Sequence, residues 1–253
     1  MNQPIATGQP IIWKGDDLFT HMLVVGATRS GKTATILKPL VYQLLLQKKR
    51  GKNLGISVIE PKGDLAGMVA EMAHEMGLEY THIDPTVERT SKFNPMEGDI
   101  DTVAEATVIV LKGLFGKQEA FFATVQELSA RNVTKLLKEL YGNKMDIIDV
   151  LVTLRDPEVL KKRVQELKAR DGETDLVHFF ESELLGTHAE KYRQFVIGLR
   201  AQLENIVSNS SLRRIMTGKS DIDIDEHFEK GGILAVNTAL GMLGKSGDAF
   251  GQF

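Results

Sequence analysis

Short apolar runs alternate with helical patterns of apolar residues over the first 98 residues. The runs lie at 21–25, 55–60 and 78–83, and each has the length of a buried strand. Between them, apolar residues recur at helical spacing over 36–45, where Pro39 is expected to kink the helix, and over 65–76, where Asp64 is the expected N-cap. Successive strand–helix–strand units predict an α/β fold with a parallel sheet, whose ligands bind at the carboxyl ends of the strands.

From about Asp99 to His227 the pattern changes to one helix after another. Apolar stripes cover 121–140 and 192–207, while Asp156-Pro157 and Asp171-Gly172 mark a helix start and a helix end. A strand pattern returns at 232–237. We therefore expect two domains: residues 1–98 and 228–253 form an α/β domain, and residues 99–227 form an all-α domain inserted into it.

Composition narrows the protein classes. The 253 residues include no cysteine, which excludes disulfides and thiolate metal sites. No apolar run approaches the roughly 18 residues of a membrane span, and the N-terminus lacks a signal-peptide pattern, so we expect a cytoplasmic chain without a membrane span. A net charge of −3 neither requires nor excludes nucleic acid as a partner.

One segment has the pattern of a phosphate-binding loop. It follows the first apolar run and reads Gly26-Ala27-Thr28-Arg29-Ser30-Gly31-Lys32-Thr33, that is, G-x-x-x-x-G-K-T. The glycines let the backbone turn tightly and present N–H groups to an anion, and the following helix adds its positive end. In such a loop Lys32 reaches the β- and γ-phosphates and Thr33 ligates Mg²⁺. The sequence predicts that the whole segment binds ATP, with Thr33 holding the metal.

Hydrolysis also needs an acidic residue at the end of a second strand. Three predicted strands end in Glu60, Asp84 and Asn237, and none of them shows an Asp-Glu pair. Whether the chain is by itself an enzyme therefore stays open. Glu60 is the best candidate beside Lys32 for a catalytic role, and a turn-stabilising role before Pro61 is the equally weighted alternative.

Several other charged groups are weaker candidates. Basic residues at 48–52 and 161–163 are able to contact DNA phosphates, although such runs are usually solvated faces. The arginines that are candidates for acting on a neighbouring subunit in a ring are Arg29, Arg200, Arg213 and Arg214. The stretch 221–225 begins like a calcium loop, but Glu226 and Gly232 stand where that loop needs glycine and glutamate, so no calcium site is expected there.

Three motifs together carry a family resemblance. They are the loop in Val24–Thr33, the run Val58-Ile59-Glu60-Pro61-Lys62-Gly63-Asp64-Leu65, and Phe93-Asn94-Pro95-Met96. In this order the chain resembles the TraG/TraD-type coupling proteins of type IV secretion and conjugation, which belong to the FtsK/HerA-like motor superfamily. The family usually has Asp where this chain has Glu60, which is a conservative difference.

The resemblance implies a P-loop, RecA-like fold and a hexameric ATPase. Such a motor pumps single-stranded DNA with its relaxase toward the type IV secretion channel, and the all-α insertion engages relaxosome proteins or DNA. Family members typically begin with transmembrane helices and continue to an Asp-Glu strand. We therefore expect this chain to be the first portion of the motor domain of a parent protein at the cytoplasmic face of the bacterial cell membrane.

Two alternatives remain open at this point. One is an FtsK/HerA-like motor that translocates double-stranded DNA or packages a genome, which does not require Lys62-Gly63 or Asn94-Pro95. The other is a nucleotide-binding adaptor that does not hydrolyse ATP and whose helices hold a partner protein.

Overall fold

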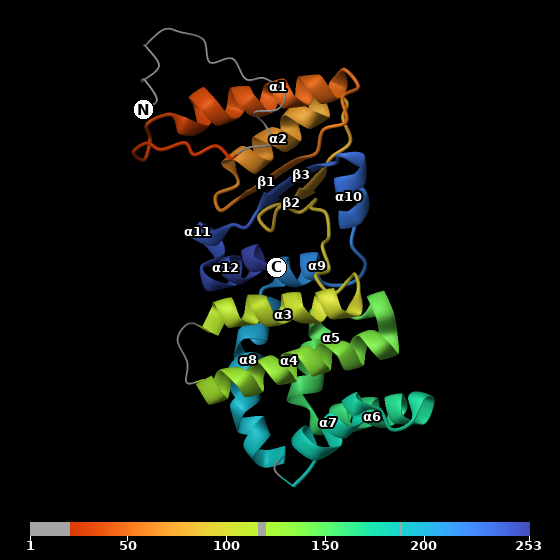
Figure 1. Ribbon diagram of the computed structural model, residues 1–253. Helices are drawn as coiled ribbons and strands as arrows, with labels where there is room; N and C mark the ends of the chain where they lie inside the picture. The colour runs from red at the N-terminus through yellow and green to blue at the C-terminus, as the bar shows by residue number, and fades with distance from the viewer. Residues whose placement is uncertain (1–20, 116–119, 188) are drawn as a thin grey trace, which may run out of the picture. The chain divides into compact units, whose positions relative to one another are not determined.

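The computed structural model describes residues 21–115, 120–187 and 189–253 (Figure 1). The chain divides into two compact units, Met1–Val41 and Tyr42–Phe253.

The described part of the first unit holds the loop and the start of a helix. The strand predicted at 21–25 is wrong: these residues form no strand, and Leu23 and Val25 are 86% and 82% exposed. An apolar run becomes a strand only where its N–H and C=O groups form hydrogen bonds with a neighbouring strand. The spacing of apolar residues does not indicate whether such a neighbour exists. The predicted helix is present as the π-helix η2 (Thr33–Leu37), continued by α1 (Lys38–Lys49). Its wide turn lies directly before Pro39, which has no N–H to donate.

A parallel three-stranded sheet lies in the second unit. Its strands are β1 (Ile56–Glu60), β2 (Thr81–Ile83) and β3 (Ile233–Asn237), in the order β1-β3-β2. Ile56 pairs with Ile233, and Thr81 pairs with Leu234. The helix α2 (Asp64–Glu75) packs on all three strands. The α/β class and the parallel sheet are confirmed, although β2 covers only the last three residues of its predicted run.

Helices make up most of the remaining chain (Figure 1). The segment between β2 and β3 contains α3 (Ile100–Phe115), α4 (Ala120–Tyr141), η3 (Gly142–Lys144), α5 (Ile147–Arg155), α6 (Pro157–Asp171), α7 (Asp175–Phe179), η4 (Phe180–Leu184), α8 (Ala189–Val207), α9 (Ser210–Met216) and α10 (Ile224–Lys230). After β3 follow α11 (Leu240–Leu243) and α12 (Lys245–Gln252). The predicted helix start at 156–157 is confirmed, because Asp156 accepts hydrogen bonds from the N–H groups of residues 158 and 159.

The sheet and the helices of the second unit share one hydrophobic core. Ile83 and Leu234 from the strands lie in the same cluster of buried side chains as Leu137, Phe180 and Leu203 from the helices. The predicted domain boundaries at 98/99 and 227/228 stay a prediction. Within the described ranges, no helix combines the length and the apolar character that crossing a bilayer requires.

Candidate phosphate-binding site

The loop at 26–33 is a tight turn with two left-handed residues. Arg29 has φ 66° and Gly31 has φ 84°. The amide of Ser30 donates to the carbonyl of Ala27 at 3.1 Å, which closes the turn between them. A left-handed arginine is uncommon because its Cβ crowds the backbone, and such strain concentrates at ligand-binding loops.

Lys32 folds back over this turn. Its Nζ donates to the carbonyls of Gly26 and Ala27, at 2.6 and 2.9 Å. A Cβ on Gly26 would lie 2.7 Å from Oγ of Ser30 and 3.3 Å from Cδ of Lys32, so a side chain there would displace both from the turn. The ammonium group of Lys32 is thus held against the loop's own backbone.

The loop leads directly into the amino end of η2. Both the amide and the hydroxyl of Thr35 donate to the carbonyl of Gly31, at 2.8 and 2.6 Å. Thr33 is the first residue of η2 and is exposed, as are Thr28 and Ser30. The N–H groups at the start of a helix have no partner within it, so this end is suited to an anion.

Glu60 stabilises the turn after β1. Its Oε2 accepts from the amide of Lys62 at 3.1 Å, and its Oε1 accepts from the amides of Leu65 and Ala66 at 3.2 and 3.5 Å. The Glu60 carboxylate therefore accepts hydrogen bonds from N–H groups of the first turn of α2, which is the role that was expected of Asp64. That expectation was wrong: Asp64 is already helical, and the N-cap position is Gly63, which has no side chain to accept a bond.

Position 63 requires glycine because of Asn237, at the end of β3. Gly63 has φ 89°, and a Cβ there would lie 2.5 Å from Nδ2 of Asn237. Asn237 is 2% exposed, and its Oδ1 accepts from the amide of Ala239 at 2.8 Å. The Pro61-Lys62-Gly63 turn thus packs against the buried side-chain amide of Asn237, which lies 174 residues after Gly63 in the chain. Nothing in the sequence around either residue indicates this contact.

The carboxyl ends of β1 and β3 border a hollow of about 210 Å³. Glu60, Thr238 and Asp248 are among its lining residues. Asp84, the third strand-end candidate, is buried after β2, where it accepts from the amide and hydroxyl of Thr86. All three strand-end polar groups, those of Glu60, Asp84 and Asn237, therefore bond to nearby backbone N–H groups.

The Asn94-Pro95 element ties the segment after β2 to the helices. Nδ2 of Asn94 donates to the carbonyl of Met145 at 2.8 Å, and its Oδ1 accepts from the amide of Met96 at 3.0 Å. Nζ of Lys138, in α4, donates to the carbonyl of Met96 at 3.0 Å. Burial lowers the pKa of the Lys138 ammonium below its ordinary value. This element therefore has a structural role.

The candidate basic clusters are partly used within the fold. Lys48 donates to the carbonyls of Leu54 and Gly231. Arg163 pairs with Asp149 at 2.9 Å and lies over the ring of Tyr141. Lys49, Lys52, Lys161 and Lys162 are exposed.

The candidate trans-acting arginines occupy different settings. Arg29 is exposed in the loop, and Arg213 is exposed on α9. Arg214 donates to the carbonyl of Val87 at 2.8 Å, and Arg200 has a buried Nε on α8. Whether any of them acts on a neighbouring subunit stays a prediction.

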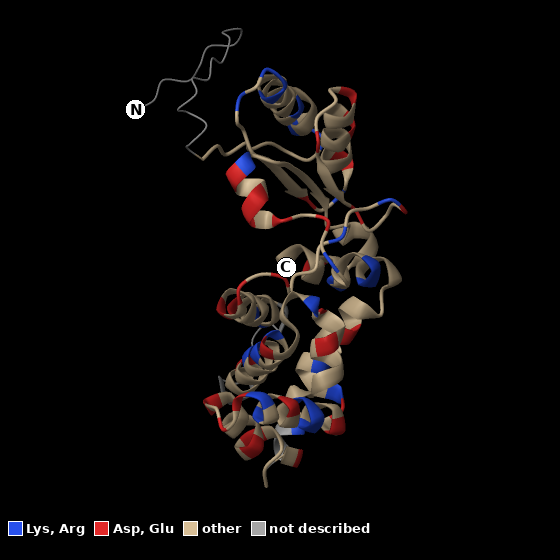
Figure 2. Ribbon diagram, turned by 90° about the vertical axis from the view of Figure 1, so that its right-hand side faces the viewer, with Lys and Arg blue, Asp and Glu red and all other residues tan. Residues whose placement is uncertain are grey.

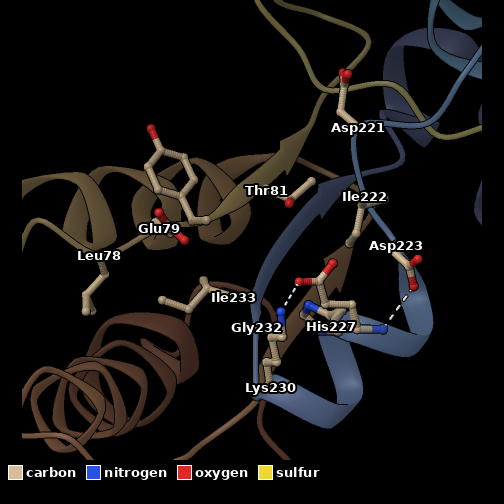
Figure 3. A pocket seen from close by; sticks show the side chains of 12 residues that line it. Leu78, Glu79, Thr81, Asp221, Ile222, Asp223, His227, Lys230, Gly232 and Ile233 are labelled. Carbon is tan, nitrogen blue, oxygen red and sulfur yellow. Dashed lines mark hydrogen bonds and ion pairs between the residues drawn. The ribbon is translucent and has the colours of Figure 1, made fainter.

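A cavity of about 600 Å³ lies at the opposite, amino-terminal edge of the sheet (Figure 3). Glu79, Asp221, Asp223 and Glu226 give it an acidic lining, and Lys230 pairs with Glu226. Fixed negative charge repels phosphate, so this cavity is a poor nucleotide site. Asp223 caps the amide of Glu226 and Asp221 accepts from the amide of Lys92, so these carboxylates serve α10 and a neighbouring loop.

Among the described residues, Glu173, His178 and Glu181 lie close enough together to share a metal ion. All three are exposed. Nζ of Lys168 lies 2.6 Å from Glu173 and 2.9 Å from Glu181, so a side-chain cation already neutralises both carboxylates. This group therefore has little reason to bind a metal.

Comparison with known proteins places the chain in a family. No curated protein matched it. The family model described as type IV secretory system conjugative DNA transfer matches residues 1–227. That span holds the loop, the Glu60-to-Gly63 turn and the Asn94-Pro95 element, and it confirms the resemblance to the coupling proteins. The chain belongs to the conjugative DNA transfer family of type IV secretory systems.

Proposed function

We propose that this chain binds MgATP through residues 26–33 and forms part of a RecA-like motor. The motor would use ATP to move DNA, with its attached relaxase, toward the type IV secretion channel. Conjugative DNA transfer is the role of the family. Beyond that family role, we propose that the motor binds ATP, assembles as a hexamer and has relaxosome proteins as partners.

The observation that carries the nucleotide proposal is the position of Lys32. Two hydrogen bonds, to the carbonyls of Gly26 and Ala27, hold its ammonium group against the turn whose backbone would receive the phosphates. An ammonium group exchanges carbonyl oxygens for phosphate oxygens readily, because charge-assisted bonds to an anion are stronger. Thr33, at the first position of η2, supplies the hydroxyl that would ligate Mg²⁺.

The remaining residues support binding more strongly than hydrolysis. Glu60 accepts bonds from the amides of Lys62, Leu65 and Ala66, which occupy both of its oxygens. Phosphoryl transfer also needs a group that orients water and, in many motors, an arginine from a neighbouring subunit. We therefore propose that the chain binds ATP by itself and hydrolyses it efficiently only in the complete assembly.

Titration with a fluorescent ATP analogue in the presence of Mg²⁺ tests the proposal. Lys32→Ala is expected to weaken binding at least about 100-fold, because it removes the cation that faces the β- and γ-phosphates. Lys38→Ala is the matched control, since Lys38 is an exposed lysine six residues further along the chain, at the start of α1. Equal affinities of the wild type and Lys32→Ala, or an equal loss in both variants, would overturn the assignment of the site.

A further inference from the structure

We propose that an exposed group of cations around α9 contacts the backbone phosphates of the transferred DNA. The group consists of Arg89, Lys92, Arg213, Arg214 and Lys219, and it is called the α9 basic surface here. The inference rests on the DNA-transfer part of the proposed function and is independent of the nucleotide site.

Two segments far apart in the sequence form this surface. The amide of Phe93 donates to the carbonyl of Ile215 at 2.9 Å, and Arg214 reaches the carbonyl of Val87. The amide and carbonyl of Lys92 both bond to Asp221, at 2.7 and 3.0 Å. Backbone bonds thus fix the loop after β2 to the segment from α9 to residue 221.

Lys92 and the end of α9 approach each other closely. A Cβ on Gly218 would lie 3.9 Å from Nζ of Lys92. Because Lys219 directly follows Gly218, the ammonium group of Lys92 lies close to the backbone that carries Lys219. The hydroxyl of Thr217 donates to the carbonyl of Arg213 at 2.7 Å and holds the turn that carries Lys219. Cations from both segments therefore share one surface.

These cations are available to a ligand. All five are exposed, and within the described ranges none of them forms an ion pair. The helices between α3 and α8 differ, because there Lys and Arg lie beside Asp and Glu (Figure 2), as in the pairs of Arg131 with Glu105 and Arg170 with Glu139.

The carboxylates near this surface are mostly bonded to backbone N–H groups. Segments 84–93 and 209–221 contain three acids, Asp84, Glu88 and Asp221. Two more approach from other segments: Asp146 accepts from the amide of Gly218 at 3.3 Å, and Glu97 accepts from the amide of Ser220 at 2.8 Å. Asp84 is buried and bonded to Thr86, and Asp221 is bonded to the amide of Lys92. Four of these five carboxylates accept bonds from backbone N–H groups, while the side chains of the five cations stay exposed.

This chemistry fits a polyanion with regularly spaced phosphates. Lysine and arginine neutralise phosphates and release counterions, and a guanidinium group binds two phosphate oxygens at once. Anionic lipid headgroups attract basic surfaces as well. DNA is favoured here because the matched family performs conjugative DNA transfer. Since such contacts carry no base readout, the surface should bind without sequence preference.

Fluorescence anisotropy of labelled oligonucleotides tests the proposal with two variants of equal charge. The first changes Arg89, Lys92, Arg213 and Lys219 to Gln and keeps Arg214, which bonds to Val87. The control changes Lys49, Lys52, Lys161 and Lys162 to Gln, which are exposed cations elsewhere. Single-stranded and double-stranded probes are titrated from about 50 to 200 mM salt, the range over which phosphate contacts change affinity most visibly.

The first variant is expected to lose about tenfold or more in affinity at low salt, while the control keeps most of its affinity. For a single strand, losing four phosphate contacts lowers the steepness of the log–log salt dependence by up to about 3. The probe that shows the larger loss identifies the strandedness of the ligand.

The proposal would be overturned if the wild type did not bind DNA, or if both variants lost DNA affinity equally. It would also be overturned if the first variant bound DNA as the wild type does and lost affinity only for phosphatidylserine vesicles. Affinity for the fluorescent ATP analogue is measured on the same samples. An intact nucleotide affinity with any of these three results rejects the α9 basic surface and leaves the nucleotide site standing.

Discussion

Nε2 of His227 lies 2.9 Å from Oγ of Ser57, which joins α10 to the edge strand β1. His227 is buried, and a Cβ on Gly232 would collide with its ring. Burial, and in second place the charge of Lys48, lowers the pKa of the His227 imidazole below its ordinary value of 6.5. The folded chain therefore holds this ring neutral at a pH where the unfolded chain has begun to protonate it.

We expect the free energy of unfolding to fall as the pH drops from about 7.5 to 5.5. The unfolded state takes up a proton near pH 6.5 and the folded state only at lower pH, so stability rises with pH in this window. Urea unfolding at several pH values measures the effect. In His227→Gln the decline should be smaller, while in His178→Gln, which changes an exposed histidine, it should stay as in the wild type. An unchanged decline in His227→Gln would contradict this assignment.

Glu60→Gln is expected to lower stability by about 1 kcal/mol, the usual effect of weakening a helix-start acceptor. An amide has only one oxygen, so it cannot accept from Lys62 on one side and Leu65 on the other. Glu71→Gln, on the exposed face of α2, is the control and should change stability little. Both variants are compared by urea unfolding.

Steady-state hydrolysis by the wild-type chain alone is expected to be slow. A missing trans arginine can by itself cost about 10³–10⁵ in rate. Release of phosphate on the order of 10 s⁻¹, a typical enzyme rate, would contradict the expectation. If Glu60→Gln then abolished that activity without loss of stability, Glu60 would be the catalytic acid.

Gly63→Ala and Gly67→Ala should have opposite effects. At Gly63 the new Cβ meets the buried amide of Asn237, and φ is 89°, so we expect a loss of about 2 kcal/mol or more. At Gly67, inside α2, no atom lies within 4 Å of the new Cβ, and alanine should add up to about 1 kcal/mol. Thermal unfolding of both variants tests this, and equal destabilisation would refute the proposed contact.

Local patterns in the sequence predicted the elements that depend on local physics. The apolar runs at 55–60 and 232–237 became β1 and β3, and Asp156 capped α6 as its position before a proline indicates. The stripe at 121–140 became α4. Each of these depends on side-chain periodicity or on a cap within a few residues, which a single sequence displays.

Partners distant in sequence were not predictable in the same way. Nothing near Gly63 indicates that Asn237 will pack against it, and the run at 21–25 does not indicate that it lacks a neighbouring strand. The role of Glu60 was left between two alternatives because it depends on which amides surround the carboxylate. The loop motif was predicted from its spacing, from the apolar run before it and from the helix after it; of these two neighbours only the helix forms, and the use of ATP stays a proposal.

The position of β3 between β1 and β2 governs when the sheet is able to form. Ile56 pairs with Ile233 and Ile83 with Val236, so neither outer strand has a partner until β3 has been synthesised. At about 5–20 residues per second, a ribosome needs on the order of ten to thirty seconds for the intervening chain. During that interval neighbouring helices such as α3 and α4 can already pack on each other, because contacts between elements close in sequence cost little loop-closure entropy. The nascent strands β1 and β2 meanwhile keep unpaired edges, which makes this stage of synthesis the one at which a chaperone would protect the chain most.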